Sequence, residues 1–342
     1  MPLNGVPASN PDSLVPNPAF AGLVSAITPE TLGLNANDLF PRIPFTSNGN
    51  GMGFFVKYNL GERFMALEDQ DLVRRPGSAA KKLNQSRRLE TFKVSQRHLD
   101  AIVPDDVARL IQAQTGGADD PHITEVQFVR GLMLLNKEKR AAQTALDPAN
   151  VRQVITVATP WTDYTNSDPL KDFQDAMMAV RSASGLVPNS LALPWDVALK
   201  LAYHPRFRVG VFAQGGVRAL TEHAEITPQA VAELLKAVLR LENVYILTSL
   251  VNQDTLKRTP TMNLASVWGP NAWVFYRPPE PSPNALMWGA DFVDTFYTGG
   301  TDLATVFTFY LPDQETTVHR IREDSDFVVM HPELAVRLAS VI

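Results

Sequence analysis

The histidines of this sequence are its best candidates for acid–base or metal chemistry, because the chain contains no cysteine. His98 stands two residues before Asp100, which could supply part of a catalytic relay, but strand alternation would place both side chains on one solvated face. His204 ends a strand-and-helix pattern at 186–207, LVPNSLALPWDVALKLAYHPRF. For all of these, and for His122, His319 and His331, the spacing implies no catalytic partner, and we predict structural roles.

Motifs of nucleotide, nucleophile and metal chemistry are missing from the sequence. The glycine-rich run SNGNGMG at 47–53 lacks the Lys-Ser/Thr pair of a phosphate-binding loop and indicates a flexible turn. Acidic clusters at 68–71 and 323–326 stand beside arginines, which is typical of a mixed-charge surface. The sequence therefore predicts no catalytic residues, no cofactor and no bound metal.

Composition narrows the class of protein further. The chain has 342 residues, 45% of them hydrophobic, which is enough for a large core divided among subdomains. Its formal net charge of -5 argues against a dedicated nucleic-acid binder. The N-terminus lacks a signal-peptide pattern, and no apolar stretch reaches the roughly 20 residues that span a bilayer. We expect a soluble intracellular product with no membrane partner.

One charge asymmetry stands out, between residues 74 and 93. Strand-like runs flank this segment, which predicts a long hairpin loop with a charged tip. The segment contains seven cations and a single acid, Glu90. The cations are Arg74, Arg75, Lys81, Lys82, Arg87, Arg88 and Lys93.

Three interpretations of this basic loop were compared. It could be a loop kept soluble by charge, or a nucleic-acid site, although the aromatic residues of a stacking platform are absent. The third interpretation is complementarity to an acidic patch on a neighbouring copy of the chain, and we favour it. The acidic candidates are Glu323, Asp324 and Asp326.

The segment 1–48 is rich in proline, with short apolar clusters between the prolines. Proline disfavours a long helix or a central strand, so an extended arm is expected. Its apolar side chains, Phe20, Leu39 and Phe40 among them, gain nothing from solvent. We therefore expect this arm to pack on another surface.

Helix signals are clear in the rest of the chain. Asp120 and Pro121 suit the N-cap and first position of a helix over 121–147, nearly 40 Å long at the usual rise. Asp-Pro at 168–169 and Thr-Pro at 227–228 open two more helices. Strands are expected at 151–158, 190–193, 244–251, 265–269, 272–277, 303–311 and 316–321. Because helices and strands do not alternate strictly, the pattern favours an α+β fold over a doubly wound sheet.

Three passages resemble the major capsid proteins of tailed bacteriophages. PNSLALPWDVALKLAYHPRF at 188–207 is similar to the family's strand and helix that end in His-Pro. VWGPNAWVFYRPPEPSPNA at 267–285 and TTVHRIREDSDFVVMHPELAVRLASVI at 316–342 resemble its later strand passage and its C-terminal strand, charged turn and apolar tail. DLFPRIPF at 38–45 and GFFVKYNLGERF at 53–64 resemble its arm and loop entry.

The resemblance implies a division of the chain into parts. An extended N-terminal arm would occupy 1–48 and an extended hairpin loop 49–93, both lying on neighbouring subunits. A peripheral domain would occupy 94–169 and contain the spine helix at 121–147. An axial domain would follow at 170–300, and 301–342 would return to the peripheral domain. His204 would then end its helix before Pro205, where a cation can interact with the last carbonyl groups.

The resemblance also implies a function and partners. The chain would assemble with itself into pentamers and hexamers that form the icosahedral head of a tailed double-stranded DNA phage, a virion protein assembled in the host cytoplasm. A scaffolding protein, a portal and a decoration protein would be partners, and packaged DNA would be contacted weakly and without sequence preference.

Family members differ in two features that bear on this sequence. Some begin with a helical scaffolding segment that is later removed, whereas this sequence opens on the arm, so either that segment has already been removed or a separate scaffolding protein is expected. Some crosslink through a loop lysine, for which Lys57, Lys81 and Lys82 are candidates. Two alternatives stay open: a cellular encapsulating-compartment shell that shares the fold, and an intracellular hydrolase with an unrecognised site.

Docking of the basic loop on acidic neighbours predicts salt-sensitive assembly. Charge reversal at Arg87 and Arg88 together should impair assembly while the monomer stays folded, as checked by sedimentation and circular dichroism. Normal shells from the double variant would overturn the docking hypothesis.

Overall fold

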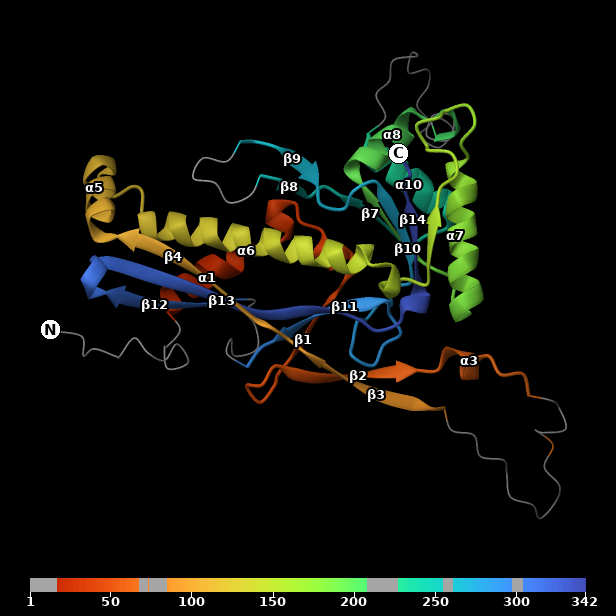
Figure 1. The fold of residues 1–342 in the computed structure, drawn as a ribbon, viewed down its shortest axis with the longest axis horizontal. Helices are drawn as coiled ribbons and strands as arrows, with labels where there is room; N and C mark the ends of the chain where they lie inside the picture. The colour runs from red at the N-terminus through yellow and green to blue at the C-terminus, as the bar shows by residue number, and fades with distance from the viewer. Residues whose placement is uncertain (1–16, 68–72, 74–84, 208–226, 255–260, 297–303) are drawn as a thin grey trace.

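The computed structural model describes residues 17–67, 73, 85–207, 227–254, 261–296 and 304–342. These residues form two five-stranded sheets, two small hairpins and a set of helices arranged around one long helix (Figure 1). The mixture of helices and strands confirms the α+β prediction.

The first sheet has the order β1-β11-β13-β12, with β4 also paired to β13. Its longest strand, β13, runs from Thr316 to Val329 and joins β11 near its end and both β4 and β12 near its start. Strand β1 runs parallel to β11, and the other pairs are antiparallel. The bounds are β1 Arg42–Phe45, β4 Gln96–Pro104, β11 Gly289–Asp294 and β12 Thr305–Leu311.

Helix α6, Pro121–Leu146, lies along this sheet and contacts β4 and β13 (Figure 1). The side chain of Asp120 accepts a hydrogen bond from the backbone N–H of His122, and Pro121 occupies the first turn, so the helix begins where the sequence predicted. Helix α5, Asp105–Thr115, follows β4 and ends at Gly116, whose left-handed backbone suits glycine.

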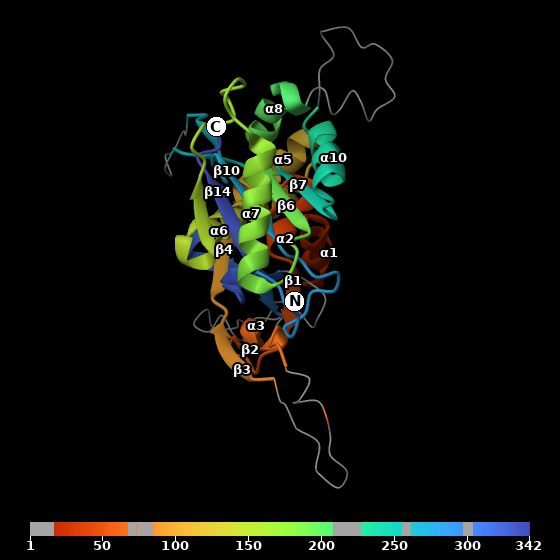
Figure 2. The same ribbon diagram turned by 90° about the vertical axis from the view of Figure 1, so that its right-hand side faces the viewer.

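The second sheet has the order β5-β14-β10-β6-β7. Its strands are β5 Gln153–Thr156, β6 Ser190–Pro194, β7 Asn243–Leu247, β10 Asn271–Phe275 and β14 Ala335–Ala339. Helices α7 Pro169–Ser184, α8 Trp195–Tyr203 and α10 Pro228–Leu239 cover one face (Figure 2). The end of α6 and helix α2, Ala36–Leu39, cover the other face, so every residue of β6 is buried.

The predicted domain boundaries do not coincide with the sheets. Strand β5 comes from 94–169 and strand β14 from 301–342, ranges assigned to the peripheral domain, yet both pair within the second sheet. The range 301–342 therefore contributes to both sheets, and the division into peripheral and axial domains stays a prediction.

A two-stranded hairpin extends away from the body of the molecule (Figures 1 and 2). It consists of β2 Met52–Tyr58 and β3 Arg87–Lys93, with the short helix α3, Leu60–Arg63, after β2. Phe55 and Phe92 are buried at its root. Gly53 is needed there, because a Cβ atom at that position would lie 2.3 Å from the Phe92 ring. A second hairpin, β8 Leu250–Asn252 and β9 Leu264–Ser266, lies near α6.

The described part of the predicted arm, residues 17–48, packs on its own chain and is not extended, which corrects the expected conformation, whereas a contact of this arm with a neighbouring subunit stays a prediction. It forms α1 Pro18–Ala26, a 3-10 turn at Glu30–Leu32, α2 and β1. Val24, Phe40 and Ile43 are buried in three different core clusters. The prolines did not prevent this, because Pro18 begins a helix, where proline is tolerated.

A second correction concerns the segment 322–326, which the sequence indicated as a charged surface turn. It continues strand β13, and most of its charged side chains are buried. Three further 3-10 turns complete the described fold, at Pro148–Asn150, Pro312–Gln314 and Pro332–Leu334.

If residues 36–45 belong to the core, Phe40→Ala should be costly. Phe40 is fully buried and its ring lies 4.8 Å from that of Trp288 and 5.4 Å from that of Phe327. Truncating a buried phenylalanine costs ~3–5 kcal/mol. Urea unfolding should show this loss for Phe40→Ala, whereas Leu32→Ala, at a 46% exposed position of the same segment, should cost less than ~1 kcal/mol. Equal losses for the two variants would contradict the placement.

Candidate assembly interface

The histidines are not assembled into a catalytic site in the described part of the chain. His98 is exposed on β4, and its neighbour Asp100 makes two 2.8 Å hydrogen bonds with Arg320 instead of orienting an imidazole. Nowhere among the described residues do three or more His, Cys, Asp or Glu side chains gather as a metal site. The same residues include no helix long and apolar enough to cross a membrane.

His204 is a packing residue at the C-cap of α8, as predicted. It is 1% exposed, and its Nε2 lies 3.2 Å from the Ser167 hydroxyl. Its Nδ1 accepts a hydrogen bond from the backbone N–H of Arg206. Burial lowers the pKa of His204, which favours the neutral imidazole, so the expected cation at the helix end is wrong.

The exposed face of the β2–β3 hairpin is the clearest candidate for a contact with another chain. Strand alternation puts Met52, Phe54 and Leu89 on the face opposite the buried Phe55 and Phe92. Their side chains are 45%, 60% and 69% exposed. Neighbouring apolar side chains left in water on a projecting ribbon are typical of an interaction surface.

Three of the seven cations of the basic segment, Arg87, Arg88 and Lys93, lie on this hairpin. Arg88 is 82% exposed and 3.9 Å from Glu90, which also lies 3.7 Å from Lys57. Arg87 is exposed and stacks over the Tyr58 ring at 5.9 Å. Both guanidinium groups remain accessible to a partner, and their inter-subunit role stays a prediction. Arg74, Arg75, Lys81 and Lys82 lie outside the described residues.

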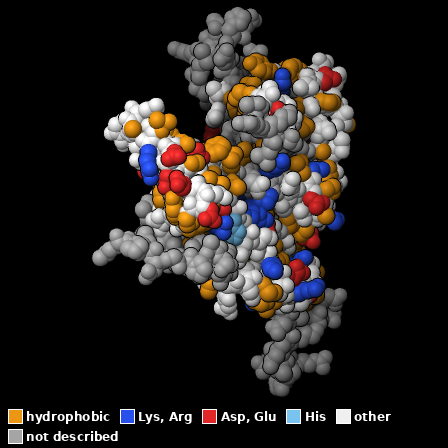
Figure 3. All heavy atoms as spheres, turned by 60° about the vertical axis from the view of Figure 1, so that its left-hand side comes forward, with side chains coloured by type: hydrophobic (Ala, Val, Ile, Leu, Met, Phe, Trp, Pro, Cys, Tyr) orange, Lys and Arg blue, Asp and Glu red, His pale blue; other side chains and the backbone are white. Residues whose placement is uncertain are grey.

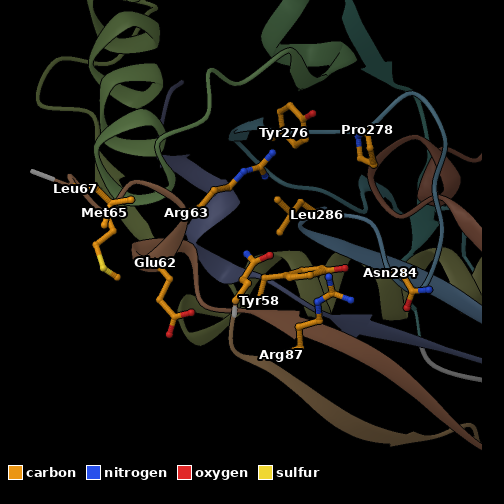
Figure 4. Close-up of a pocket in the computed structure, with 11 residues that line it drawn as sticks. Tyr58, Glu62, Arg63, Met65, Leu67, Arg87, Tyr276, Pro278, Asn284 and Leu286 are labelled. Carbon is orange, nitrogen blue, oxygen red and sulfur yellow. The ribbon is translucent and has the colours of Figure 1, made fainter. Parts of the chain in front are cut away.

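A groove of about 940 Å³ lies beside the α3 end of the hairpin, where β2 ends and β3 begins (Figure 4). Tyr58, Arg63 and Arg87 line it from the hairpin side, with Tyr276 and Leu286 on the other. Hydrogen bonds from Ser86 lower the pKa of Glu62, the acidic residue of the lining, and keep it ionised. The groove combines aromatic and charged groups of both signs, which suits a polypeptide contact better than a small apolar ligand.

Of the three predicted acidic partners, Glu323 is buried in an ion cluster of its own chain. Its carboxylate lies 2.6 Å from Arg130 Nη1 and 2.7 Å from Lys137 Nζ. Lys137 Nζ also lies 2.6 Å from Asp291. Burial raises the pKa of Glu323, but the two cations outweigh burial and hold it well below its ordinary value. Burial raises the pKa of Asp291, and Lys137 only partly offsets this.

The other two acidic candidates are also paired inside the chain. Asp324 is 7% exposed and forms a two-pronged contact with Arg322 at 2.7–3.0 Å. Asp326 is half-buried and lies 3.3 Å from both Arg97 and Arg140. Because Glu323 and Asp324 are buried, Asp326 is the one of the three that keeps an accessible carboxylate, and its docking role stays a prediction.

Sequence reasoning missed the inward-facing charges of α6. Glu138 is buried and accepts hydrogen bonds from the backbone N–H groups of Asn35 and Ala36, the Ser249 hydroxyl and the Trp268 indole. Burial raises its pKa, partly offset by the bond from Ser249. A signal was present in the sequence. Arg130, Lys137 and Glu138 each stand three or four residues from an apolar position of the buried helix face, such as Val126, Leu134 or Ala141.

A second exposed apolar group lies at the α5 end of the molecule. Figure 3, turned toward that end, shows hydrophobic side chains interspersed with charges of both signs. The most exposed apolar residues on β4, α5 and α6 are Ile102, Leu110 and Phe128, at 56%, 58% and 61%. This mixed surface resembles the composition of ordinary protein contacts.

Comparison with known proteins places the fold. No family model matches the sequence, and no curated protein sequence matches it. A phage-related protein from Bordetella bronchiseptica RB50 is similar over 96% of this chain and 98% of its own, with a TM-score of 0.68 and 21% identity. The capsid of the cyanophage P-SCSP1u matches 87% of this chain and 85% of its own, with a TM-score of 0.51 and 9% identity.

The chain is also similar to an encapsulin. The match with the holo-SrpI encapsulin complex from Synechococcus elongatus PCC 7942 covers 97% of this chain and 92% of the encapsulin chain, with a TM-score of 0.50 and 11% identity. The described elements, with a long helix against one sheet, a second sheet and a projecting hairpin, define the α+β fold of viral and virus-like shells. The chain has the major capsid fold of tailed bacteriophages, which confirms the resemblance at the level of fold.

Lys137 should be essential for stability, because it separates two buried carboxylates. Lys137→Met should cost ~3–5 kcal/mol at pH 7, since both carboxylates lose a counter-ion. Without the ammonium group the pKa of Asp291 rises further above its unfolded value and the pKa of Glu323 rises from its lowered value, so the deficit should shrink as pH falls toward 4.5. Urea unfolding at the two pH values measures this.

Lys171→Met is the matched control for Lys137→Met. Lys171 forms an exposed ion pair with Asp175 on α7, and its loss should change stability by less than ~0.5 kcal/mol at either pH. A Lys137→Met variant as stable as this control would contradict the assignment of the buried cluster.

Proposed function

We propose that this chain is a structural shell protein, without enzymatic activity, that assembles with itself into pentamers and hexamers of a tailed-phage head. The observation that carries the proposal is the projecting β2–β3 hairpin on a capsid fold. Its outer face exposes Phe54 and Leu89 to water, and the basic residues Arg87 and Arg88 of the same hairpin are exposed. These features are accounted for by a second copy of the chain seated against the hairpin.

Self-assembly of this kind depends on many modest contacts. Each interface of a closed symmetric shell needs only a few kcal/mol beyond the cost of association, because every subunit repeats it. The exposed hairpin face, the groove beside α3 and the apolar group at the α5 end lie on different parts of the surface. A subunit with several separate contact surfaces suits a tiled shell better than a simple dimer.

The partners follow from this role. A separate scaffolding protein would guide assembly in the host cytoplasm, and a portal and a decoration protein would join the finished virion. Double-stranded DNA inside the shell would be held by confinement with weak contacts, which is consistent with the acidic net charge of -5.

A cellular encapsulating compartment is the second candidate. The similarity to the encapsulin, which extends over almost the whole of both chains, supports this second candidate function. Particles from a compartment would package a protein cargo, whereas phage heads package a genome. Nuclease-protected DNA in particles made with the native partners would support the phage role, and a co-purifying enzyme would support the compartment.

The proposal is tested by expressing the chain alone and with a candidate scaffold, followed by sedimentation velocity. Capsomer-sized rings or larger particles that weaken with rising salt are expected. A discrete monomer or small dimer under both conditions would contradict the proposal and would favour the alternative hypothesis of an intracellular hydrolase.

One variant tests the hairpin directly. Leu89→Asp places a carboxylate in the exposed apolar face and should abolish particles while circular dichroism and the unfolding midpoint stay unchanged, because Leu89 touches no core. Leu264→Asp, on β9 of the other hairpin and 47% exposed, is the matched control and should still assemble. Normal particles from Leu89→Asp would exclude the hairpin face as an interface.

A further inference from the structure

Two histidines far apart in the sequence meet where α6 begins over the first sheet. His122 Nδ1 lies 3.0 Å from His319 Nε2, and the rings are nearly perpendicular. On its other side, His319 Nδ1 lies 2.9 Å from the Thr308 hydroxyl, which lies 3.0 Å from the Asn17 side-chain amide. Four side chains therefore form one hydrogen-bonded row from the start of α1 to the start of α6.

The donors and acceptors of this row can all be paired with both imidazoles neutral. In one such arrangement the Asn17 amide donates to Thr308 Oγ1, whose own hydrogen is directed to His319 Nδ1. With Nδ1 accepting, the proton of His319 sits on Nε2 and is donated to His122 Nδ1. Every contact is satisfied when both imidazoles are neutral.

This row holds helix α1 in place. Phe20 of α1 packs on the His319 ring at 4.6 Å between centroids, and Val24 is buried with Val126 and Ile321. The backbone N–H of Asn17 donates to the carbonyl of Val306. Helix α1 contacts α6 and β12, so His319 lies under it between the two elements on which it rests.

The surroundings of His319 leave little to stabilise a positive charge. It is 2% exposed, α1 has no charged residue, β12 contributes Thr308 and β4 places Ala101 opposite. From the start of α6 come His122 and Asp120, and Asp120 favours the charged form too weakly to compensate. Burial, together with His122, lowers the pKa of His319 to about 4.

We propose that His122 and His319 form an acid-sensitive latch that holds α1 on the first sheet and releases it when His319 takes up a proton. A proton on His319 turns both of its ring nitrogens into donors, so Nδ1 can no longer accept the hydroxyl hydrogen of Thr308, and it places a positive charge at a site that is 2% exposed. The latch is a property of the single chain and does not depend on the proposed function.

The direction of the pH effect follows from linkage. A histidine whose pKa is lower in the latched state than in solution stabilises that state above its ordinary value near 6.5, and this stabilisation is lost as pH falls toward 4. The opening equilibrium of α1 should therefore increase by roughly 100-fold between pH 7 and pH 4. The apolar cluster beneath α1 becomes exposed on release.

Hydrogen–deuterium exchange of the full chain at a series of pH values, corrected for intrinsic exchange rates, tests the latch. Protection of the amides in α1 should fall by roughly 100-fold between pH 7 and 4, while that of α7, which lies far from the pair, is retained. Unchanged protection of α1 across this range would overturn the proposal.

Substitutions separate the latch from general acid sensitivity. His319→Gln cannot titrate and should make the protection of α1 independent of pH, whereas His98→Gln, a control at an exposed histidine of β4, should behave as the parent chain. His122→Gln removes one cause of the lowered pKa of His319, so this pKa should move back toward 6.5 and the change in α1 protection between pH 7 and 4 should become smaller, which keeps a test available if His319→Gln does not fold. Parental pH dependence in both His319→Gln and His122→Gln would overturn the latch.

Discussion

The structure depends on a buried cluster of ions between helix α6 and the first sheet. Lys137 lies between Asp291 of β11 and Glu323 of β13, and Arg130 completes the pairing of Glu323. Two cations balance two carboxylates, so the several kcal/mol that each buried charge costs is offset by close partners. The next residue, Glu138, binds the start of α2 from the same helix. Helix α6 thereby fixes strands β11 and β13 and the N-terminal segment.

This arrangement explains which parts of the molecule are left for assembly. The buried charges of α6, Arg130, Lys137 and Glu138, are paired inside the chain, and the second sheet is covered on both faces by apolar clusters. The β2–β3 hairpin is held to the body by the buried Phe55 and Phe92 and by a backbone hydrogen bond from Val56 to Pro283, and it exposes Phe54 and Leu89. A compact body with an exposed apolar hairpin face is typical of a subunit whose hairpin becomes buried against a neighbouring subunit on assembly.

Local sequence signals predicted most of the helices and strands. Which side chains are buried depends on pairing between segments far apart in the sequence and could not be predicted in this way. Asp120-Pro121 and Thr227-Pro228 began helices where expected, because N-caps act within one turn. The burial of Glu323 could not be predicted, since its partners stand 186 and 193 residues away. The same holds for Phe40, whose core position depends on β1 joining β11. Of the predicted site, the exposure of Arg87 and Arg88 agrees with the structure and the free acidic patch does not.

Electron cryomicroscopy of particles purified from the expressed chain tests the central claim most directly. The account predicts closed shells of pentamers and hexamers in which the β2–β3 hairpin of each subunit lies against an adjacent subunit, with α6 clamped to its own sheet by Lys137. Discrete monomers, or particles in which the outer face of the hairpin contacts no neighbour, would contradict it.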